Sequence, residues 1–478
     1  MESNREIESF IKEFVKDLAE SNVAVFAGAG MSKTAGFVNW ADLLRDIATE
    51  LGLSVDKEHD LISLAQYHVN ENRGKAGINK KILEEFAQEA VPTETHNILA
   101  RLPIITFWTT NYDTLIEDSL KAANKVVDIK HQVKQLANTR PKRDVVIYKM
   151  HGDVHHPADA IITKEQYESY YKTHESFVTT LSGDLILKTF LFIGFSFTDP
   201  NLDYVLSRLN IQFGENSRQH YCFIKKQSRG KDDDEIFKYN LRKQELMIND
   251  LKRYKIKAIL VEEYSDITEI LKEIERRYRK KTVFISGSAE EYGAWNRNEA
   301  QSFIHSLSRS IVSAGFRIVN GFGWGVGSAV INGALEAVYE RPDKYSEDQL
   351  IMRPFPQFET GEKKLADLWE EYRQRMISLA GIAVFIFGNK NDGKGNIISA
   401  NGVKREFQIA IANGLIPIPI AATGYTTQEI FNEIVKAPEH IYEGMEWIIP
   451  IIKELSSETI TADEIIKKVI TIIQTINK

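Results

Sequence analysis

His151 is the residue of this sequence best suited to acid–base chemistry, because it directly follows an apolar, strand-like run at 145–150. A neutral imidazole, with a reference pKa of about 6.5, can accept a proton at physiological pH. Asn111 and Asp113 lie at the end of a second apolar run, 104–110. An amide and a carboxylate at the end of a buried strand could hold ribose hydroxyl groups or orient a water molecule. Both residue types are also good helix N-caps, and that alternative stays open for this pair.

Glycines after another apolar run suggest contact with a phosphate. Gly28 and Gly30 follow the run 23–26. Glycines at such a place let backbone amides approach a pyrophosphate, and the next helix N-terminus favours negative charge. The strict dinucleotide-binding fingerprint needs a third glycine where Lys33 stands, so a tight strand-to-helix turn is the alternative explanation.

A fourth polar string follows the run 190–193 and contains Ser196 and Asp199. These two side chains again lie where a strand is expected to end. The alternative is that Asp199 or Asn201 caps the following helix.

We expect no metal cofactor. The single cysteine, Cys222, excludes an intramolecular disulfide and a cysteine-rich metal site. His155 and His156 lie close to His151 in the sequence, but Gly152 favours a loop over a helix that would align two histidines.

The elements that would position these residues form an alternating pattern. Short apolar runs rich in β-branched and aromatic residues alternate with helical patterns, which predicts a parallel sheet with helices on both faces. The carboxyl ends of such strands meet at one edge, where ligands bind. The predicted strands are 23–26, 104–108, 145–149, 190–193, 221–224 and 256–261. Residues 3–20 are predicted to form a helix packed on the same domain, and the alternative is an arm that docks on a neighbouring subunit.

A second α/β pattern begins near residue 280, after a helix and a basic run. A chain of 478 residues is too long for one ordinary core. We therefore predict an α/β protein of two doubly wound domains, each a mostly parallel sheet flanked by helices, with boundaries 1–281 and 282–478. The strands predicted for the second domain are 282–288, 317–320, 382–387 and 416–420, before a final helix at 462–477.

The second half also contains a glycine-rich cradle. Gly287 and Ser288 end one predicted strand, and the glycine-rich string 321–328 follows another. Small residues at both places suit a nucleotide or sugar phosphate, although close packing alone could require them. Elsewhere in this half, Arg373 and Lys390 could neutralise phosphates, Glu406 could accept ribose hydroxyls, and Trp324 and Phe355 could stack on a base.

Charge and hydropathy narrow the possible partners. The net charge of −7 argues against a general nucleic-acid binder. No apolar run is long enough to span a membrane, and no signal peptide is visible. We expect a soluble, cytoplasmic protein that binds neither nucleic acid nor membrane.

The four polar strings of residues 20–225 resemble, in order and character, the NAD-handling core of the sirtuin family. This resemblance implies that Asn111 positions the ribose and water where nicotinamide leaves, and that His151 is the general base. Deacylating sirtuins carry four zinc cysteines and a Pro-Asp-Phe-Arg segment, but this chain has one cysteine and Phe37–Trp40 after Gly36. The resemblance therefore points to cleavage of NAD itself, with NAD contacts at Ala27, Gly28, Ala29, Gly30, Ser32, Asn111, Asp113, Ser196 and Asp199.

The second half resembles the SLOG superfamily, but Phe387–Lys390 replaces the Pro-Gly-Gly-x-Gly-Thr segment of its phosphoribohydrolases. This difference favours binding over hydrolysis. A sirtuin-like domain followed by a SLOG domain resembles the NAD-hydrolysing effectors of the Thoeris anti-phage defence system. The resemblance implies a homotetramer switched on by a cyclic ADP-ribose isomer, which a partner TIR-domain enzyme makes. It implies signal contacts at Gly287, Ser288, Trp324, Phe355, Arg373, Lys390, Gly402 and Glu406.

Three other functions remain compatible with these residues. They are an NAD-dependent protein deacylase, a non-catalytic nucleotide sensor and a structural assembly protein. The lone cysteine disfavours the deacylase.

Overall fold

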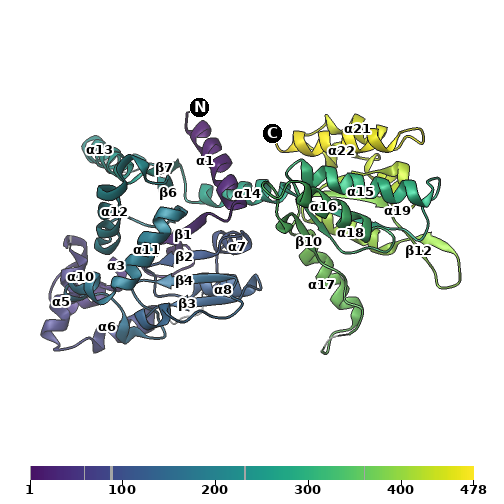
Figure 1. Cartoon of the computed structure of the whole chain (residues 1–478). Coiled ribbons are helices and arrows are strands. Elements are labelled where there is room, and N and C mark those ends of the chain that lie inside the picture. Colours follow the sequence, from purple (N-terminus) through teal and green to yellow (C-terminus); the bar gives the residue numbers. More distant parts are fainter. Residues whose placement is uncertain (1, 59, 87–89, 231–232, 360) are drawn as a thin grey trace. The chain divides into compact units, whose positions relative to one another are not determined.

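The computed structural model describes residues 2–58, 60–86, 90–230, 233–359 and 361–478. The chain forms two compact units, one ending at Glu275 and one running from Arg276 to Lys478. The change of unit falls inside α14 (Ser265–Lys280), a few residues before the boundary predicted at residue 281. Each unit contains its own parallel sheet (Figure 1).

Seven parallel strands form the sheet in the described part of the first unit. They are β1 (Val23–Ala27), β2 (Thr106–Thr109), β3 (Val127–Lys130), β4 (Val145–Lys149), β5 (Thr189–Ile193), β6 (His220–Lys225) and β7 (Ile256–Val261). Their order is β3-β4-β2-β1-β5-β6-β7. The six predicted strands are present. The edge strand β3 escaped prediction because two of its four residues, Asp128 and Lys130, are charged.

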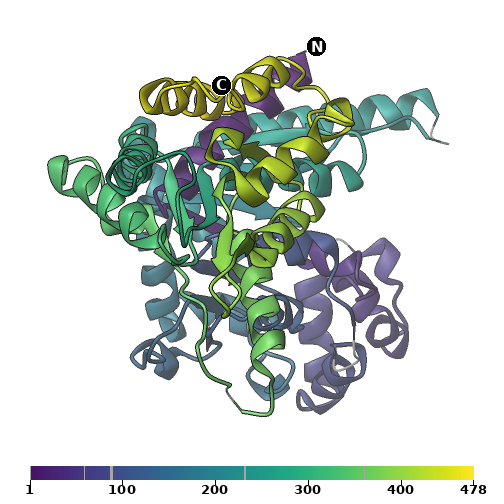
Figure 2. The same ribbon diagram turned by 90° about the vertical axis from the view of Figure 1, so that its right-hand side faces the viewer.

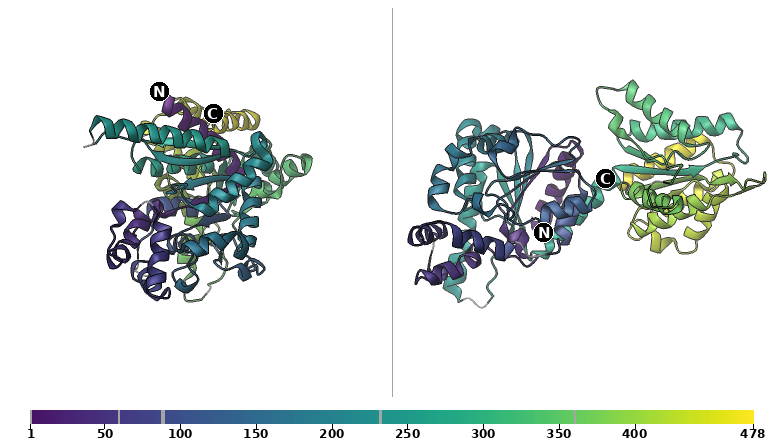
Figure 3. Two further views of the ribbon diagram at one scale, coloured as in Figure 1. Left: turned by 90° about the vertical axis from the view of Figure 1, so that its left-hand side faces the viewer. Right: turned by 90° about the horizontal axis from the view of Figure 1, so that it is seen from below.

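The longer helices of the first unit lie on both faces of this sheet (Figure 3). The helices are α1 (Glu2–Ala19), α2 (Ala29–Lys33), α3 (Trp40–Leu43), α4 (Arg45–Glu50), α5 (Leu61–Glu71), α6 (Ala76–Phe86), α7 (Glu94–Arg101), α8 (Leu115–Ala122), α9 (Val133–Leu136), α10 (Lys164–Thr173), α11 (Glu175–Leu187), α12 (Pro200–Phe213), α13 (Asp234–Leu251) and α14.

Alternate residues of β6 show how the two faces are covered. Cys222 belongs to the core that α11 and α12 form with the sheet. Tyr221 points to the opposite face, where its ring lies 4.7 Å from that of Phe10 on α1. The helix predicted near the N-terminus therefore packs on its own unit. The helices α3 to α6 lie between β1 and β2 in the sequence and form a separate small core.

The second unit repeats the architecture with five parallel strands in the order β10-β9-β8-β11-β14, within the residues described. These are β8 (Thr282–Ser288), β9 (Arg317–Asn320), β10 (Leu350–Met352), β11 (Ile382–Phe387) and β14 (Ile416–Pro419), and β12 (Asn389–Asn391) pairs with β13 (Ile397–Ser399) as an antiparallel hairpin. Helices flank this sheet on either side (Figure 2). They are α15 (Arg297–Ser313), α16 (Gly327–Glu340), α17 (Leu365–Ile377), α18 (Asn401–Ala412), α19 (Tyr425–Ile434), α20 (Pro438–Ile441), α21 (Ile448–Glu454) and α22 (Ala462–Ile476).

Both sheets confirm the predicted fold class of two doubly wound α/β domains. The interior strand β11 is buried along its whole length, as expected for a parallel strand covered on both faces. Among the described residues, no helix is both long enough and apolar enough to cross a membrane.

Candidate active site

Two glycine loops meet at the carboxyl edge of the first sheet, between β1 and β5. The chain passes from β1 to β2 on one side and later returns to β5 on the other, so the strand order reverses here. Such a switch point forms the ligand crevice of an open parallel sheet. A Cβ atom at Gly28 would lie 2.5 Å from the carbonyl oxygen of Gly194, and one at Gly194 would lie 2.2 Å from the Met31 nitrogen. Only glycine therefore fits at either position.

The backbone amides of these loops already have partners inside the protein. The N–H of Gly28 donates to the Ile193 carbonyl, and the N–H of Gly30 donates to the Gly194 carbonyl, both at 2.9 Å. The tight turn that was the alternative explanation for these glycines is thus present. Ala29 and Gly30 nevertheless line an adjoining cavity.

This cavity measures about 600 Å³, within the range typical of small-molecule sites. Ser196 and Asp199 line it from the β5–α12 loop, and Thr110 lines it from the end of β2. Trp40 and Tyr167 supply aromatic walls. The cavity therefore gathers part of the predicted NAD contacts, while Ala27, Gly28, Ser32, Asn111, Asp113 and His151 lie behind its surface.

Asn111, Ser32 and Asp113 form a buried hydrogen-bonded chain between two strand ends. The Asn111 amide donates to Ser32 Oγ at 2.9 Å and to the Gly28 carbonyl at 3.1 Å. Ser32 Oγ donates in turn to Asp113 Oδ2 at 2.7 Å. The second carboxylate oxygen of Asp113 accepts the backbone N–H of Leu115 at 3.1 Å, although the N-cap residue of α8 is Thr114 and not Asp113. The structure thus brings Ser32, Asn111 and Asp113, three of the residues singled out from the sequence, into contact.

His151 occupies a buried position with polar groups at both ring nitrogens. Its Nε2 lies 3.3 Å from Asp199 Oδ2 and 3.4 Å from Asn201 Nδ2. Its Nδ1 lies 3.3 Å from the Tyr167 hydroxyl. Burial lowers the pKa of His151 although the charge of Asp199 opposes this shift. The neutral imidazole that a general base requires is therefore favoured at neutral pH.

Tyr167 lies between His151 and the cavity. Its side chain lines the cavity, and its ring packs against the imidazole with centroids 5.2 Å apart. His151 itself is 1% exposed. In this arrangement a molecule in the cavity meets Tyr167 and Asp199 before it meets the imidazole.

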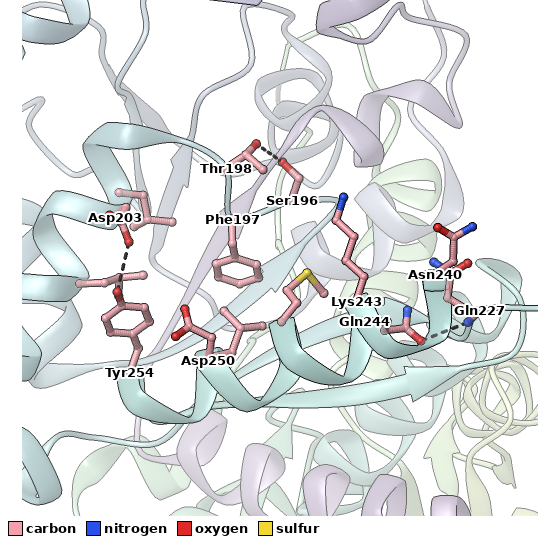
Figure 4. Close-up of a pocket in the computed structure, with 14 residues that line it drawn as sticks. Ser196, Phe197, Thr198, Asp203, Gln227, Asn240, Lys243, Gln244, Asp250 and Tyr254 are labelled. Atoms are coloured by element: carbon pink, nitrogen blue, oxygen red, sulfur yellow. Dashed lines mark hydrogen bonds between the residues drawn. The ribbon is translucent and has the colours of Figure 1, made fainter. Parts of the chain in front are cut away.

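A second cavity of about 480 Å³ lies on the other side of the β5–α12 loop (Figure 4). Ser196 and Thr198 line both cavities, and their hydroxyl oxygens are 2.8 Å apart. Lys243 of α13 and Gln227 after β6 contribute polar groups to the second cavity. The two cavities therefore adjoin along one loop.

Sequence reasoning missed several residues of this site. Tyr167 and Asn201 contact His151 from α10 and α12, and Lys243 reaches the second cavity from α13. None of them stands at a strand end, which was the signal used for the other residues. Asn201 was considered only as a helix cap, although it lies in the same polar string as Asp199.

The second unit brings four of the predicted signal contacts together. Glu406 is buried, and its Oε2 accepts the Ser286 hydroxyl at 2.6 Å. Arg373 Nε lies 3.7 Å from Glu406 Oε1, and the guanidinium stands over the Phe355 ring at 5.1 Å. A Cβ at Gly402 would lie 3.2 Å from the Arg373 guanidinium. Burial raises the pKa of the Glu406 carboxyl.

The other four predicted signal contacts lie at the carboxyl edge of the same sheet, where Gly287 and Ser288 end β8, Trp324 lies in the β9–α16 loop and Lys390 lies in β12. The N–H of Ala289, just after Ser288, donates to the Trp324 carbonyl at 2.8 Å. Ser288 Oγ donates at 3.0 Å to the carbonyl of Asn389, the neighbour of Lys390. The side chains of Trp324 and Lys390 are exposed. A Cβ at Gly323 would lie 2.0 Å from the Gly287 carbonyl oxygen, so close packing does require glycine there.

Possible metal ligands are dispersed. No group of three or more His, Cys, Asp or Glu side chains within the described ranges is placed to hold a metal ion. Cys222 is buried, and burial raises the pKa of its thiol to about 12.

Comparison with known proteins gives consistent matches over both units. Residues 105–247 match the family model described as SIR2-like domain, and residues 266–476 match the Sir2- and TIR-associating SLOG family. The chain is 49% identical over 477 residues to "NAD(+) hydrolase ThsA" of Bacillus cereus (strain MSX-D12), covering 99% of each chain. It is 47% identical to the protein of the same name from Cytobacillus dafuensis, covering 98% of this chain and 96% of the relative. The match to that of Acinetobacter baumannii (strain 532279) is 48% identical and covers 90% and 91% of the two chains.

Proposed function

Because the chain belongs to the ThsA family of NAD(+) hydrolases, we propose that it cleaves NAD⁺ in the cavity beside His151. NAD⁺ and water react to give ADP-ribose and nicotinamide. The observation that carries this placement is the position of His151, Tyr167 and Asp199 together at the switch point of the sheet.

The bond that breaks joins nicotinamide to the ribose. Nicotinamide leaves readily because its positive charge is neutralised as the bonding electrons move to its ring. The transition state at the ribose carbon is oxocarbenium-like, as in other glycosidic cleavages. Water then forms the new bond to this carbon and releases a proton. The protein must position the ribose, stabilise the cation and deliver the water.

His151 is the general base that takes the proton from water, since its lowered pKa keeps the imidazole neutral. Asn111 positions the ribose and the water through its amide. Ser32 and Asp113 hold that amide in place through their hydrogen-bonded chain. For this contact to form, the buried Asn111 and His151 must become accessible from the cavity, so the site described above is a closed form.

The substrate extends over both adjoining cavities. Its nicotinamide riboside end occupies the cavity beside Tyr167, and its adenosine end occupies the one beside α13 (Figure 4). The shared loop, with Ser196 and Thr198, then lies beside the pyrophosphate. The remaining contacts come from the residues of the β1–α2 turn, which are Ala27, Gly28, Ala29 and Gly30, and from Asp199.

The second unit binds a cyclic ADP-ribose isomer that switches the hydrolase on. Arg373 neutralises a phosphate through its guanidinium, and Glu406 accepts ribose hydroxyls. Gly402 leaves room for the Arg373 guanidinium, Phe355 stacks beside it, and Lys390 reaches the phosphates from the hairpin. The buried Nε of Arg373 lacks a hydrogen-bond partner within the described residues, which supports a site made for an incoming acceptor.

The partner and the assembly are further parts of this proposal. The matched family model is described as Sir2- and TIR-associating, which supports a TIR-domain enzyme as the source of the signal. We further propose that the protein works in the cytoplasm as a homotetramer, uses no zinc or other cofactor, and depletes NAD⁺ during phage infection.

Nicotinamide release tests this proposal directly. The purified protein is incubated with NAD⁺, with and without each cyclic ADP-ribose isomer, and once with EDTA. Release only with an isomer, unchanged by EDTA, supports the hydrolase, the switch and the absence of a metal. Release without any isomer would refute the switch alone, and no release under any condition would refute the hydrolase.

A further inference from the structure

Lys149 is a fully buried lysine at the end of β4, and no role discussed above uses it. Its side chain has 0% relative exposure and is among the largest that the protein buries completely. A buried ammonium is costly unless several acceptors surround it. The identity of those acceptors therefore shows what this residue does.

Four oxygen atoms surround the Lys149 ammonium. Two are backbone carbonyls, of Tyr112 at 3.1 Å and Asp113 at 2.6 Å. Two are carboxylates, of Glu117 at 2.8 Å and Asp153 at 2.7 Å. Burial alone would lower the pKa of Lys149, but the two carboxylate charges raise it above its ordinary value. The side chain is therefore an ammonium ion, and its three N–H groups are shared among these four oxygens.

Three of these acceptors belong to the two loops that carry Asn111 and His151. Tyr112 and Asp113 directly follow Asn111, and Asp153 lies two residues after His151. A backbone bond from the Val154 N–H to the Tyr112 carbonyl, at 2.9 Å, joins the same loops. The fourth acceptor, Glu117, lies on the first turn of α8 and pairs with the ammonium. One cation thus connects both loops and the helix that follows the first of them.

We propose that Lys149 is a positioning residue for NAD⁺ hydrolysis, which sets the place of Asn111 relative to His151 by bridging their loops. This inference rests on the proposed roles of Asn111 and His151. Lys149 touches neither side chain, so it acts through the Tyr112 and Asp113 carbonyls and the Asp153 carboxylate. A change of about 1 Å in such a geometry can lower a rate by about 100-fold.

A merely structural ion pair would behave differently, and Lys130 provides the matched control. Lys130 is also a buried lysine at the end of a strand in the same sheet, β3, and pairs with Asp128 at 2.9 Å. It also donates to the Asn138 carbonyl. Its partners lie at the sheet edge, outside both catalytic loops. Lys130→Met should therefore lower stability but leave the reaction rate of the folded protein unchanged.

The test compares full-length Lys149→Met, Asp153→Asn, Lys130→Met and wild type, with Asn111→Ala and His151→Ala as references. NAD⁺ turnover is measured with the cyclic ADP-ribose isomer that gives the highest wild-type rate, or with NAD⁺ alone if none raises it. Lys149→Met should lower kcat by about 100-fold with little change in KM, because positioning acts on the transition state. Amide hydrogen exchange should rise in segments 110–114 and 151–154 of Lys149→Met. In Lys130→Met, exchange in the same segments should rise only slightly.

Asp153→Asn should still fold, because the positive charge of Lys149 remains paired with the negative charge of Glu117. It should lower kcat by about 10-fold, and it decides the question if Lys149→Met does not fold. Wild-type kcat in Lys149→Met, or in Asp153→Asn when only that variant folds, would overturn the inference. Wild-type kcat in Asn111→Ala and His151→Ala would instead overturn the residue roles on which the inference rests.

Discussion

The hydroxyl of Tyr167 lies 3.3 Å from Nδ1 of His151, while the same side chain forms a wall of the 600 Å³ cavity. The proposed base therefore lies behind Tyr167 and Asp199, which both line the cavity. His151 is otherwise buried, so the side chains of the site are in place while the imidazole is not accessible from the cavity. The proposed hydrolysis beside His151 therefore requires Tyr167 to move.

Substitutions of Tyr167 separate its screening effect from its hydrogen bond. Tyr167→Ala should raise NAD⁺ hydrolysis without any signal, because the ring no longer covers His151. Tyr167→Phe keeps the ring but loses the hydroxyl, so its rate without signal should stay at the wild-type level. Nicotinamide release measured without cyclic ADP-ribose isomers checks both. Equal basal rates in Tyr167→Ala and wild type would show that the ring does not restrict access.

The acid limb of the pH–rate profile should report the environment of His151. Burial lowers the His151 pKa and the Asp199 charge opposes this, so kcat should hold as pH falls through about 6.5 and decline only at lower pH. Asp199→Asn removes the opposing charge and should move the acid limb to still lower pH. An asparagine can keep the helix cap that Asp199 gives to Asn201 and Leu202. An acid limb that moves to higher pH would contradict this assignment.

Buried neutral histidines should make the first unit sensitive to acid. Burial lowers the pKa of His220 to about 3, and its Nδ1 accepts the Phe190 N–H at 3.1 Å between β5 and β6. Below pH of about 6.5 the unfolded chain binds a proton that the folded chain does not, so stability falls as pH falls towards 3. In His220→Gln, the loss of unfolding free energy between pH 6 and 4 should be smaller by about 1.4 kcal/mol per pH unit. Urea unfolding at several pH values measures this, and parallel curves for variant and wild type would refute it.

Loss of Arg373 should weaken the response to the signal without changing the NAD⁺ site. A charge-assisted hydrogen bond contributes about 1.5–3 kcal/mol, so Arg373→Ala should raise the half-activating isomer concentration by about 10- to 100-fold. Lys390→Ala should act in the same direction. Arg405→Ala is the matched control, because Arg405 joins α17 and α18 through an exposed pair with Glu370 that contributes little. An unchanged half-activating concentration in Arg373→Ala would remove Arg373 from the signal site.

The sequence allowed the polar strand ends to be predicted because they depend on local patterns. The strings containing Gly28, Asn111 and His151 each follow an apolar run that became a strand of the first sheet. The edge strand β3 was missed because Asp128 and Lys130 interrupt its apolar character. Lys149 was read only as part of a strand, since nothing local shows that its ammonium reaches the Tyr112 carbonyl.

The contacts that close the site could not be predicted from local patterns. Tyr167 lies on a helix, sixteen positions from His151, and meets it only because α10 packs over the end of β4. The second cavity depends in the same way on α13, a helix whose only fully buried side chain among those described is Leu251. Such contacts follow from how helices cross the sheet, which apolar periodicity does not specify.

The most direct test of the account is nicotinamide release by wild type, His151→Ala and Asn111→Ala, at a concentration of cyclic ADP-ribose isomer that fully activates the wild type. The account predicts that both variants lose NAD⁺ hydrolysis, by at least the 10²- to 10⁴-fold that a general base typically contributes, yet assemble as the wild type does. Turnover near the wild-type rate in either variant would contradict the placement of the reaction beside His151.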